Sequence, residues 1–568
     1  MRIPTIFAGR RRHLLLLLVG NSVVQALVTI GTALLVRTVF DGWLTEQSLQ
    51  LSWEVALIVT GFITLALSAA GLRMRERIDA EKLGQDYALQ VRKLLFKHLT
   101  ELAPRTLQQR SRGGHLLRFI GDLTALRQWV SLGVARLIVA ALTTVITLIA
   151  LAWINTPLAA LVALLLGMGA VAALISGRKM QAAVAETRRC RALLAANISE
   201  KIAVMPVVQV CGQEPRERRR LAQQGRRLSG AMIDRATQVG WLRAITEATN
   251  GLAVAGVLVL GALEVSQGRA SAGSLVAALS VLGMLTPALR DLGRIHEYWS
   301  GYQVSRQKIR SFLAIPGSIR DQSQAKPLPV RRGAVRLNAI SLNGAFEALQ
   351  GEIQGGSRVA IVGANGAGKS TLFSLIARQL RPDSGEVLID GCDLEGASLA
   401  SIRRQIALVS PDLPLLRGTI EYNVRYRWRD APDAEVARVC ALCGVEELVA
   451  ELPRGMQTRL SEGGMNLSLG QRQRIILARA LLGDPKILLL DEVDANLDAS
   501  SMALLDRILV GFEGTLLLAS HRAERIRKMD GLWHLGNGGI IEQGDPVVLL
   551  SRPGPTMQLF SNELRVVA

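Results

Sequence analysis

A glycine-rich loop between a short apolar strand and the start of a helix constrains the fold more than any other feature of the sequence. The stretch VAIVGANGAGKST, Val359–Thr371, has the glycine and lysine spacing of a phosphate-binding loop. Glycines let backbone N–H groups close around phosphate oxygens, and the following helix presents its positive end to the same anion. We therefore expect an α/β domain with nucleotide contacts from Gly363, Ala364, Asn365, Gly366, Ala367, Gly368, Lys369, Ser370 and Thr371.

Five side chains in and after this loop have the chemistry that hydrolysis of a nucleotide requires. Lys369 can reach the β- and γ-phosphates, and Ser370 can ligate Mg²⁺. Downstream, the apolar run KILLLD is typical of a buried central strand and ends in Asp491. Asp491 is placed to hold Mg²⁺ through water, and the adjacent Glu492 is placed to deprotonate an attacking water. A second apolar strand, TLLLASH, ends in His521, which we expect to face the γ-phosphate.

Apolar stretches dominate the first 290 residues. The chain is 49% hydrophobic and only 20% charged, and a bilayer core demands about 20 apolar residues per helix. Six stretches have this length, roughly 14–36, 53–72, 131–153, 157–177, 248–266 and 272–291. They predict six spans in three pairs, with short turns such as Asn155-Thr-Pro within the pairs. Few polar residues lie in or near these spans, and Asn21, Gln25 and Glu247 are either substrate contacts or helix-packing contacts.

The distribution of charge indicates how the spans are oriented. The formal net charge is +20, and the basic residues gather in the long connections 73–129 and 178–243 and at the N-terminus. By the positive-inside rule, these segments and both termini are expected in the cytoplasm. Aromatic residues are only 4%, too few for platforms that stack on bases, so nucleic acid is not an expected partner.

These observations predict four parts of the chain: a transmembrane domain over 1–302, a polar linker over 303–329, a nucleotide-binding domain over 330–545 and a C-terminal tail over 546–568. The expected fold is therefore an α-helical six-span transmembrane domain followed by an α/β ATPase domain with a phosphate-binding loop.

Two further motifs indicate a family. The segment NLSLGQRQR, which begins at Asn466, resembles the signature segment of ATP-binding cassette (ABC) proteins. The segment DEVDANLD resembles their Walker B motif and D-loop, which assigns the D-loop aspartate to Asp498. With six preceding spans, the chain resembles an exporter-type half-transporter in which a membrane domain is fused to a nucleotide-binding domain.

The resemblance implies a mechanism that uses two cassettes, ATP and Mg²⁺. In this family the signature serves the nucleotide of a second cassette, so Ser468, Gly470 and Gln471 are expected to meet ATP bound by the other half. The partner is then a second half-transporter, and the sequence leaves open whether it is an identical or a different chain.

Three positions depart from the family pattern. Leu469 stands where the signature usually has glycine, and Pro411 stands where a glutamine usually contacts Mg²⁺. Gly344 stands where an aromatic residue usually stacks on adenine, and Phe346 is the nearest substitute. We therefore expect a site that hydrolyses ATP slowly.

The expected function is ATP-driven export or flipping of a small hydrophobic or amphipathic substrate, in contact with membrane lipids, across a bacterial inner membrane. One alternative is a heterodimer subunit with a weakened ATP site in thiol or heme export for cytochrome assembly. Another is a regulatory subunit with little turnover, and a third is import in place of export.

Overall fold

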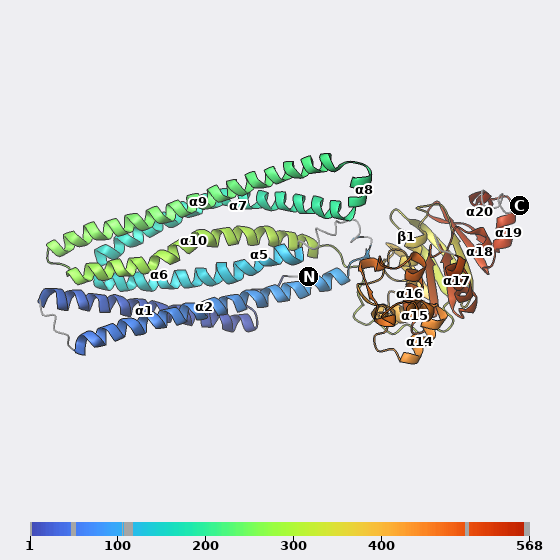
Figure 1. Ribbon diagram of the computed structural model, residues 1–568, viewed down its shortest axis with the longest axis horizontal. Helices are drawn as coiled ribbons and strands as arrows, with labels where there is room; N and C mark the ends of the chain where they lie inside the picture. The colour runs from blue at the N-terminus through green and yellow to red at the C-terminus, as the bar shows by residue number, and fades with distance from the viewer. Residues whose placement is uncertain (1–2, 47–52, 105, 107–117, 495–498, 562–568) are drawn as a thin grey trace. The chain divides into compact units, whose positions relative to one another are not determined.

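The computed structural model describes residues 3–46, 53–104, 106, 118–494 and 499–561. The chain divides into two compact units, which are described separately (Figure 1). The first unit comprises Met1–Thr100 and Arg105–Pro316, and the second comprises Glu101–Pro104 and Gly317–Ala568. The last helix of the first unit extends to Leu313 and so includes the start of the segment expected as a linker. The domain boundaries proposed from the sequence stay a prediction.

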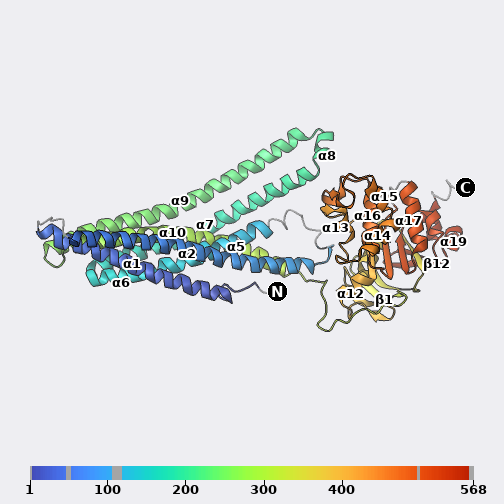
Figure 2. The same ribbon diagram turned by 60° about the horizontal axis from the view of Figure 1, so that its bottom comes forward.

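The first unit is built from long helices that run side by side (Figures 1 and 2). Their apolar stretches continue into charged stretches rich in arginine, alanine and leucine, which are strong helix formers, so each helix continues beyond its apolar part. The helices are α1 (Arg10–Glu46), α2 (Trp53–Thr100), α5 (Leu123–Gln128), α6 (Ala135–Ile154), α7 (Thr156–Ala203), α8 (Met205–Val210), α9 (Glu214–Ser266) and α10 (Ala272–Leu313), with π-helical turns η1 (Arg118–Asp122) and η2 (Trp129–Val134).

Four stretches of helix in the described residues are long and apolar enough to cross a membrane. They are Arg10–Asp41, Val55–Thr100, Ile120–Trp153 and Glu214–Ser266. Two shorter apolar helices, Thr156–Ala172 and Ala272–Gly283, coincide with the two remaining predicted spans. The count of six spans therefore stays a prediction, and these helices do not conflict with it.

A polar side chain begins the long helix α7, and two others join α1 to α2. Asn155 caps α7, since its side chain accepts a hydrogen bond from the N–H of Leu158 at 3.0 Å. Between α1 and α2, Asn21 donates to the carbonyl oxygen of Leu72 at 2.9 Å, and Gln25 bonds Glu76 at the same distance. In this conformation Asn21 and Gln25 therefore make helix-packing contacts.

The π-helical turn η2 accommodates a large aromatic side chain. Trp129 is 8% exposed, and its ring lies 4.8 Å from that of Trp299 between centroids. A Cβ atom added at Gly133 would come within 2.3 Å of the Trp129 ring. Because Gly133 has no Cβ atom, the Trp129 ring can pack against the helix at this position.

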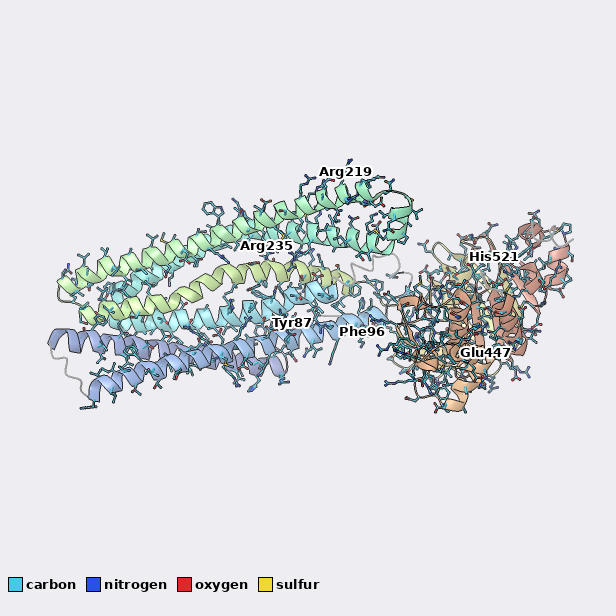
Figure 3. All side chains as sticks on the ribbon, in the orientation of Figure 1. Tyr87, Phe96, Arg219, Arg235, Glu447 and His521 are labelled. Atoms are coloured by element: carbon cyan, nitrogen blue, oxygen red, sulfur yellow. The ribbon has the colours of Figure 1, made fainter. Side chains whose placement is uncertain are left out.

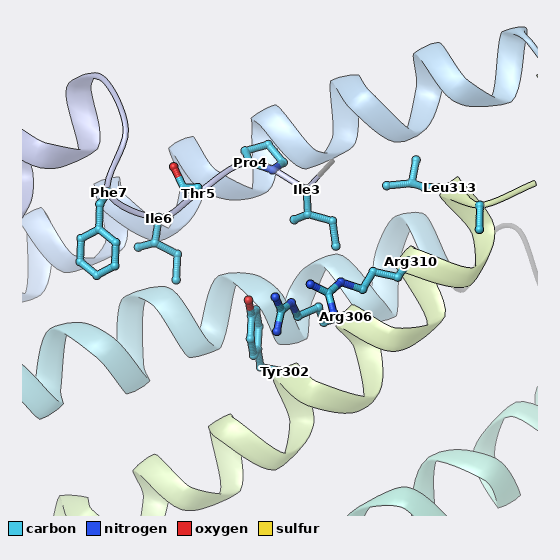
Figure 4. A pocket seen from close by; sticks show the side chains of 10 residues that line it. Ile3, Pro4, Thr5, Ile6, Phe7, Tyr302, Arg306, Arg310 and Leu313 are labelled. Atoms are coloured by element: carbon cyan, nitrogen blue, oxygen red, sulfur yellow. The ribbon is translucent and has the colours of Figure 1, made fainter. Parts of the chain in front are cut away.

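The N-terminal segment Ile3–Phe7 lies along α10, and a cavity of about 600 Å³ separates it from Tyr302, Arg306 and Arg310 (Figure 4). Arg11 anchors this segment. Its guanidinium is buried and donates to the carbonyl oxygen of Thr5 at 2.9 Å.

The described residues of the second unit form three sheets. The largest has the strand order β12-β11-β3-β10-β9-β6, in which all neighbouring pairs except β11–β12 are parallel. Its strands are β3 (Arg358–Val362), β6 (Ile406–Val409), β9 (Ile487–Asp491), β10 (Thr515–Ala519), β11 (Gly531–Gly536) and β12 (Gly539–Gly544). An antiparallel sheet contains β1 (Val335–Leu342), β2 (Phe346–Ile353), β4 (Ser384–Ile389) and β5 (Cys392–Asp393), and a small sheet pairs β7 (Gly418–Thr419) with β8 (Arg459–Leu460).

The strands β9 and β10 of the six-stranded sheet are buried on both faces. Alternate residues of β9 belong to different hydrophobic cores: Leu488 and Leu490 to one, Ile487 and Leu489 to the other. Because successive side chains point to opposite faces, an uninterrupted apolar run is what a strand covered on both faces requires. The helices around the sheets are α11 (Lys369–Ile376), α12 (Leu399–Gln405), α13 (Ile420–Val424), α14 (Asp433–Leu442), α15 (Val445–Ala450), α16 (Leu469–Leu481), α17 (Ala499–Gly511), α18 (Ala523–Ile526), α19 (Pro546–Ser551) and α20 (Pro555–Leu559). A unit of long, largely apolar helices followed by an α/β unit is thus confirmed.

Candidate nucleotide site

The candidate site lies at one edge of the six-stranded sheet. The strands β3, β10, β9 and β6 are adjacent and parallel, so their carboxyl ends meet at this edge. The register pairs Ala519 with both Ile361 and Asp491. Consequently the phosphate loop after β3, His521 after β10 and Glu492 after β9 are neighbours, although up to about 160 residues of chain separate them.

Glycine is required at several points of the phosphate loop. Gly366 and Gly368 have φ angles of 86° and 99°, which side chains with a Cβ atom rarely adopt. A Cβ atom at Gly368 would also lie 2.8 Å from the ring of Phe346. This ring is 2% exposed and packs beneath the loop, so the idea that Phe346 stacks on adenine is wrong.

Lys369 begins α11 and points back into the loop. Its side chain is buried, and Nζ donates to the carbonyl oxygen of Gly363 at 2.9 Å. Burial lowers the pKa of Lys369, while the carboxylates of Glu492 and Asp491 oppose that shift. The ammonium group is therefore held where it can meet phosphate oxygens bound by the loop.

Asp491 ends β9 in a buried position at 5% exposure. Burial raises its pKa, and a hydrogen bond from the hydroxyl of Ser370 acts in the opposite direction. Within the described residues, the Oδ1 atom of Asp491 is buried and has no hydrogen-bond partner. A carboxylate oxygen without a partner beside a serine hydroxyl fits the oxygen ligands that Mg²⁺ prefers, so these two residues are suited to hold that ion.

Glu492 and His521 face each other across the ends of β9 and β10. The His521 Nε2 atom lies 3.5 Å from the Glu492 Oε1 atom, and both side chains are about half exposed. Glu492 has a φ angle of 50°, a left-handed conformation that costs on the order of 1–3 kcal/mol in a residue other than glycine. Its N–H donates to the carbonyl oxygen of Ala519 at 3.1 Å, which helps to hold that conformation. Figure 3 labels His521 on the second unit.

The connection after β6 contains a polar contact that the sequence analysis missed. Pro411 has no side-chain polar atom, but the preceding Ser410 is buried and its hydroxyl donates to Asp491 Oδ2 over 3.5 Å. The N–H of Asp412 donates in turn to the Ser410 hydroxyl at 3.3 Å. In the sequence, this contact is indicated only by the serine that directly follows the apolar strand IALV.

A buried ion pair supports the same edge and was also missed. Asp494 and Arg525 are 4% and 6% exposed, and Arg525 Nη1 lies 3.0 Å from Asp494 Oδ2. The hydroxyl of Ser520 donates to the same oxygen at 2.5 Å, and Arg525 Nη2 lies 2.7 Å from Asp506 Oδ1. Because Ser520 precedes His521, this network connects the segments that carry His521 and Glu492.

The predicted signature segment begins α16 on the surface. Ser468 caps the helix in a capping box: it accepts from the N–H of Gln471 at 3.2 Å, and the Gln471 side chain accepts from the N–H of Ser468 at 2.9 Å. Gly470 follows in the first turn, and Leu469 is 41% exposed. The predicted D-loop aspartate, Asp498, lies outside the described residues.

At the position where the family pattern predicts a contact with the base of the nucleotide, this chain has a glycine. Gly344, at the position where the family pattern has an aromatic residue, lies in a turn with a φ angle of 73° between β1 and β2. Of the remaining predicted loop residues, Ala364 and Asn365 are exposed, and Ala367 and Thr371 are partly buried.

Comparisons with known families match both units. Residues 346–495 match the family described as ABC transporter, and residues 13–289 match the family described as ABC transporter transmembrane region. A solved structure of a bacterial Atm1-family ABC exporter with ATP bound superposes with a TM-score of 0.88 at 25% identity, over 97% of this chain and 98% of the other.

Several curated relatives resemble the chain at similar levels. The uncharacterized ABC transporter ATP-binding protein YknV of Bacillus subtilis is 28% identical over 91% of this chain and 86% of its own length. An ATP-dependent lipid A-core flippase of Desulfotalea psychrophila is 26% identical over 95% of both chains. Another, of Xylella fastidiosa, is 34% identical over 56% of this chain and 57% of its own.

Proposed function

Because the chain belongs to the ABC transporters, as an exporter-type half-transporter with membrane and ATPase domains in one polypeptide, we propose that it exports or flips a hydrophobic or amphipathic substrate across the bacterial inner membrane. It is an ATPase coupled to transport. Both termini lie on the cytoplasmic side in this proposal, as the positive-inside rule favours. The lipid A-core flippases among its relatives support a substrate with a lipid-like part.

The observation that carries the proposal is the meeting of Lys369, Glu492 and His521 at one sheet edge. Lys369 binds the β- and γ-phosphates, and Glu492 orients the attacking water and accepts its proton. His521 lies 3.5 Å from Glu492 and holds the γ-phosphate against it. Ser370 and Asp491 would hold Mg²⁺, which neutralises developing phosphate charge when bound.

The transport step in this proposal uses two cassettes. The start of α16 is exposed, and there Ser468, Gly470 and Gln471, with Asp498 beyond them, serve ATP bound by the second half. ATP favours the closed pair because it contacts both halves, and hydrolysis removes that preference, so the membrane helices alternate between two openings.

The second half is either an identical chain or a different one. Leu469 is exposed at the signature, where it would meet the nucleotide bound by the other chain. This favours a pair of different chains in which the ATP site completed by this signature is weakened. Chain purified alone that migrates as a dimer with substantial ATPase activity would establish the identical pair, whereas a monomer with negligible activity would point to a different partner or a regulatory subunit.

The decisive test replaces Glu492 with glutamine in the full chain, reconstituted in lipid. We expect ATPase activity to fall by about 10²–10⁴-fold, the usual contribution of a positioned general base. The matched control is Glu524→Gln, since Glu524 is 89% exposed in the same unit. ATPase activity that survives Glu492→Gln would refute the role assigned to this residue.

Transport direction is tested separately with inverted and right-side-out membrane vesicles. ATP-dependent accumulation of a fluorescent amphiphile in inverted vesicles alone is the expected result. Accumulation only in right-side-out vesicles loaded with ATP would indicate import.

A further inference from the structure

The helical unit encloses a second cavity, of about 540 Å³, among η1, α5, α7, α9 and α10. Its polar lining consists mainly of ionisable side chains: Asp122, Arg188, Arg191, Arg235, Glu297 and Lys308. We call it the basic cavity. Figure 3 labels Arg235 on α9, one of its walls.

Both carboxylates of the basic cavity are already engaged. Glu297 forms an ion pair with Arg235. Asp122 accepts a hydrogen bond from the hydroxyl of Ser305 at 2.9 Å, and Arg188 Nη1 contacts the same hydroxyl at 2.6 Å. These acids therefore fix two of the arginines in place.

Positive charge remains in excess. Four cationic and two anionic side chains line the cavity, so its formal net charge is +2. In the part of the chain that the structure describes, the side chains of Arg191 and Lys308 form no hydrogen bond or ion pair. Burial lowers the pKa of Arg188, Asp122 opposes this shift, and repulsion from Arg235 and Arg191 adds to it. The guanidinium groups thus repel one another, and an anion between them would relieve that repulsion.

The basic cavity lies toward the polar ends of α7 and α10. On α7 the apolar stretch is Thr156–Ala172, and Arg191 lies well beyond it. On α10 the apolar stretch is Ala272–Gly283, and Lys308 lies near the opposite end, shortly before the chain enters the ATPase unit. On α7 and α10 the cavity therefore lies outside these apolar stretches. In the orientation proposed above this is the cytoplasmic end, from which an exporter takes up its cargo.

We propose that the basic cavity binds the anionic group, a phosphate or a carboxylate, of an amphipathic transport substrate. The inference rests on the proposed export function and narrows its substrate class. The volume is within the range of about 300–1,000 Å³ that is usual for small-molecule sites. Arg191 on α7 and Lys308 on α10 supply the free donors, and one anion bound to both would link these two helices.

The test measures binding to the full chain in nanodiscs of phosphatidylcholine, in the Glu492→Gln background and without ATP. The probes are dodecyl phosphate, dodecyltrimethylammonium and glycerol 3-phosphate, each followed by microscale thermophoresis. We expect dodecyl phosphate to bind at least tenfold more tightly than the cationic amphiphile. Arg191→Ala and Lys308→Ala should each weaken phosphate binding about tenfold, the loss of one charge-assisted hydrogen bond.

The matched control is Arg189→Ala. Arg189 is on the same helix, is 74% exposed and pairs with Glu186 at 3.7 Å, so its removal should leave binding unchanged. Lys308→Arg should retain tight binding, which separates a charge requirement from a general disturbance of the helix.

Each outcome has a defined meaning. Binding of glycerol 3-phosphate as well as dodecyl phosphate supports a soluble anionic cargo, and binding of dodecyl phosphate alone supports a lipid-like one. Equal binding of the anionic and cationic amphiphiles, or unchanged binding after Arg191→Ala and Lys308→Ala together, overturns the proposal. Because no hydrolysis is measured, this result is independent of the ATPase test.

Discussion

The carboxyl edge of the six-stranded sheet and the start of α16 are built in opposite ways. At the sheet edge, Lys369, Asp491 and Asp494 are at most 5% exposed and are bonded to residues of the same chain. At the start of α16, the capping box is internal to one turn, and Leu469 is 41% exposed. In the proposed mechanism, the chain thus completes the half that binds its own nucleotide, whereas the signature half requires a second cassette.

The largest expected effect is the loss of stability when the buried ion pair of Asp494 and Arg525 at the sheet edge is broken. Arg525→Met leaves Asp494 charged, buried and without its cation, which should cost about 3–5 kcal/mol of unfolding free energy. Thermal unfolding of the full chain measures it as a fall in the midpoint of the ATPase unit.

Two variants make this prediction specific. Arg527→Met, at an exposed position beside α18, should leave the midpoint unchanged. Asp494→Thr combined with Arg525→Met should recover most of the loss, since no buried charge is then left unpaired. A midpoint equal to wild type in Arg525→Met alone would mean that the pair contributes nothing.

A smaller effect, on ATPase activity, is expected from a change at the exposed start of α16. Leu469→Gly removes the side chain that would meet the opposing nucleotide and should raise the ATPase activity of an identical pair by about tenfold, which corresponds to ~1.4 kcal/mol of barrier. Steady-state hydrolysis by the chain purified alone is the measurement. No change in a verified dimer would show that Leu469 does not obstruct the site.

The smallest expected effect is on thermal stability, at Asp491, where a single substitution should change stability and hydrolysis in opposite directions. Because burial raises the pKa of Asp491, the folded unit disfavours the ionised carboxylate. Asp491→Asn should therefore raise the thermal midpoint without nucleotide by only about 1–3 °C, while Mg²⁺-dependent hydrolysis is lost. A lower midpoint would contradict this account of the buried carboxylate.

Sequence patterns predicted much of the fold because the relevant forces are local. The runs KILLLD and TLLLAS are buried on both faces, and the phosphate loop has the glycines that its backbone angles demand. Asn155 begins a helix through its own side chain, so the turn before α7 was also predictable.

Other features depend on contacts distant in the sequence. Asp494 and Arg525 are 31 residues apart, and nothing in either local pattern indicates that they pair. Ser410 reaches Asp491 only because β6 and β9 are neighbours in the sheet. Phe346 was misjudged for the same reason: the fold places its ring under Gly368 and away from the surface.

The π-helical turn η2 has a consequence for the direction in which α6 faces. A π turn contains one residue more than an α-helical turn, and each α-helical residue advances the helix by about 100°. Deleting Gly133 would therefore convert η2 to regular helix and rotate the preceding helical segment against α6 by roughly that angle. Trp129, whose ring now lies 4.8 Å from that of Trp299 between centroids, would turn away from α10. The single extra residue thus determines how α5, which lines the basic cavity, is rotated relative to the apolar helix α6.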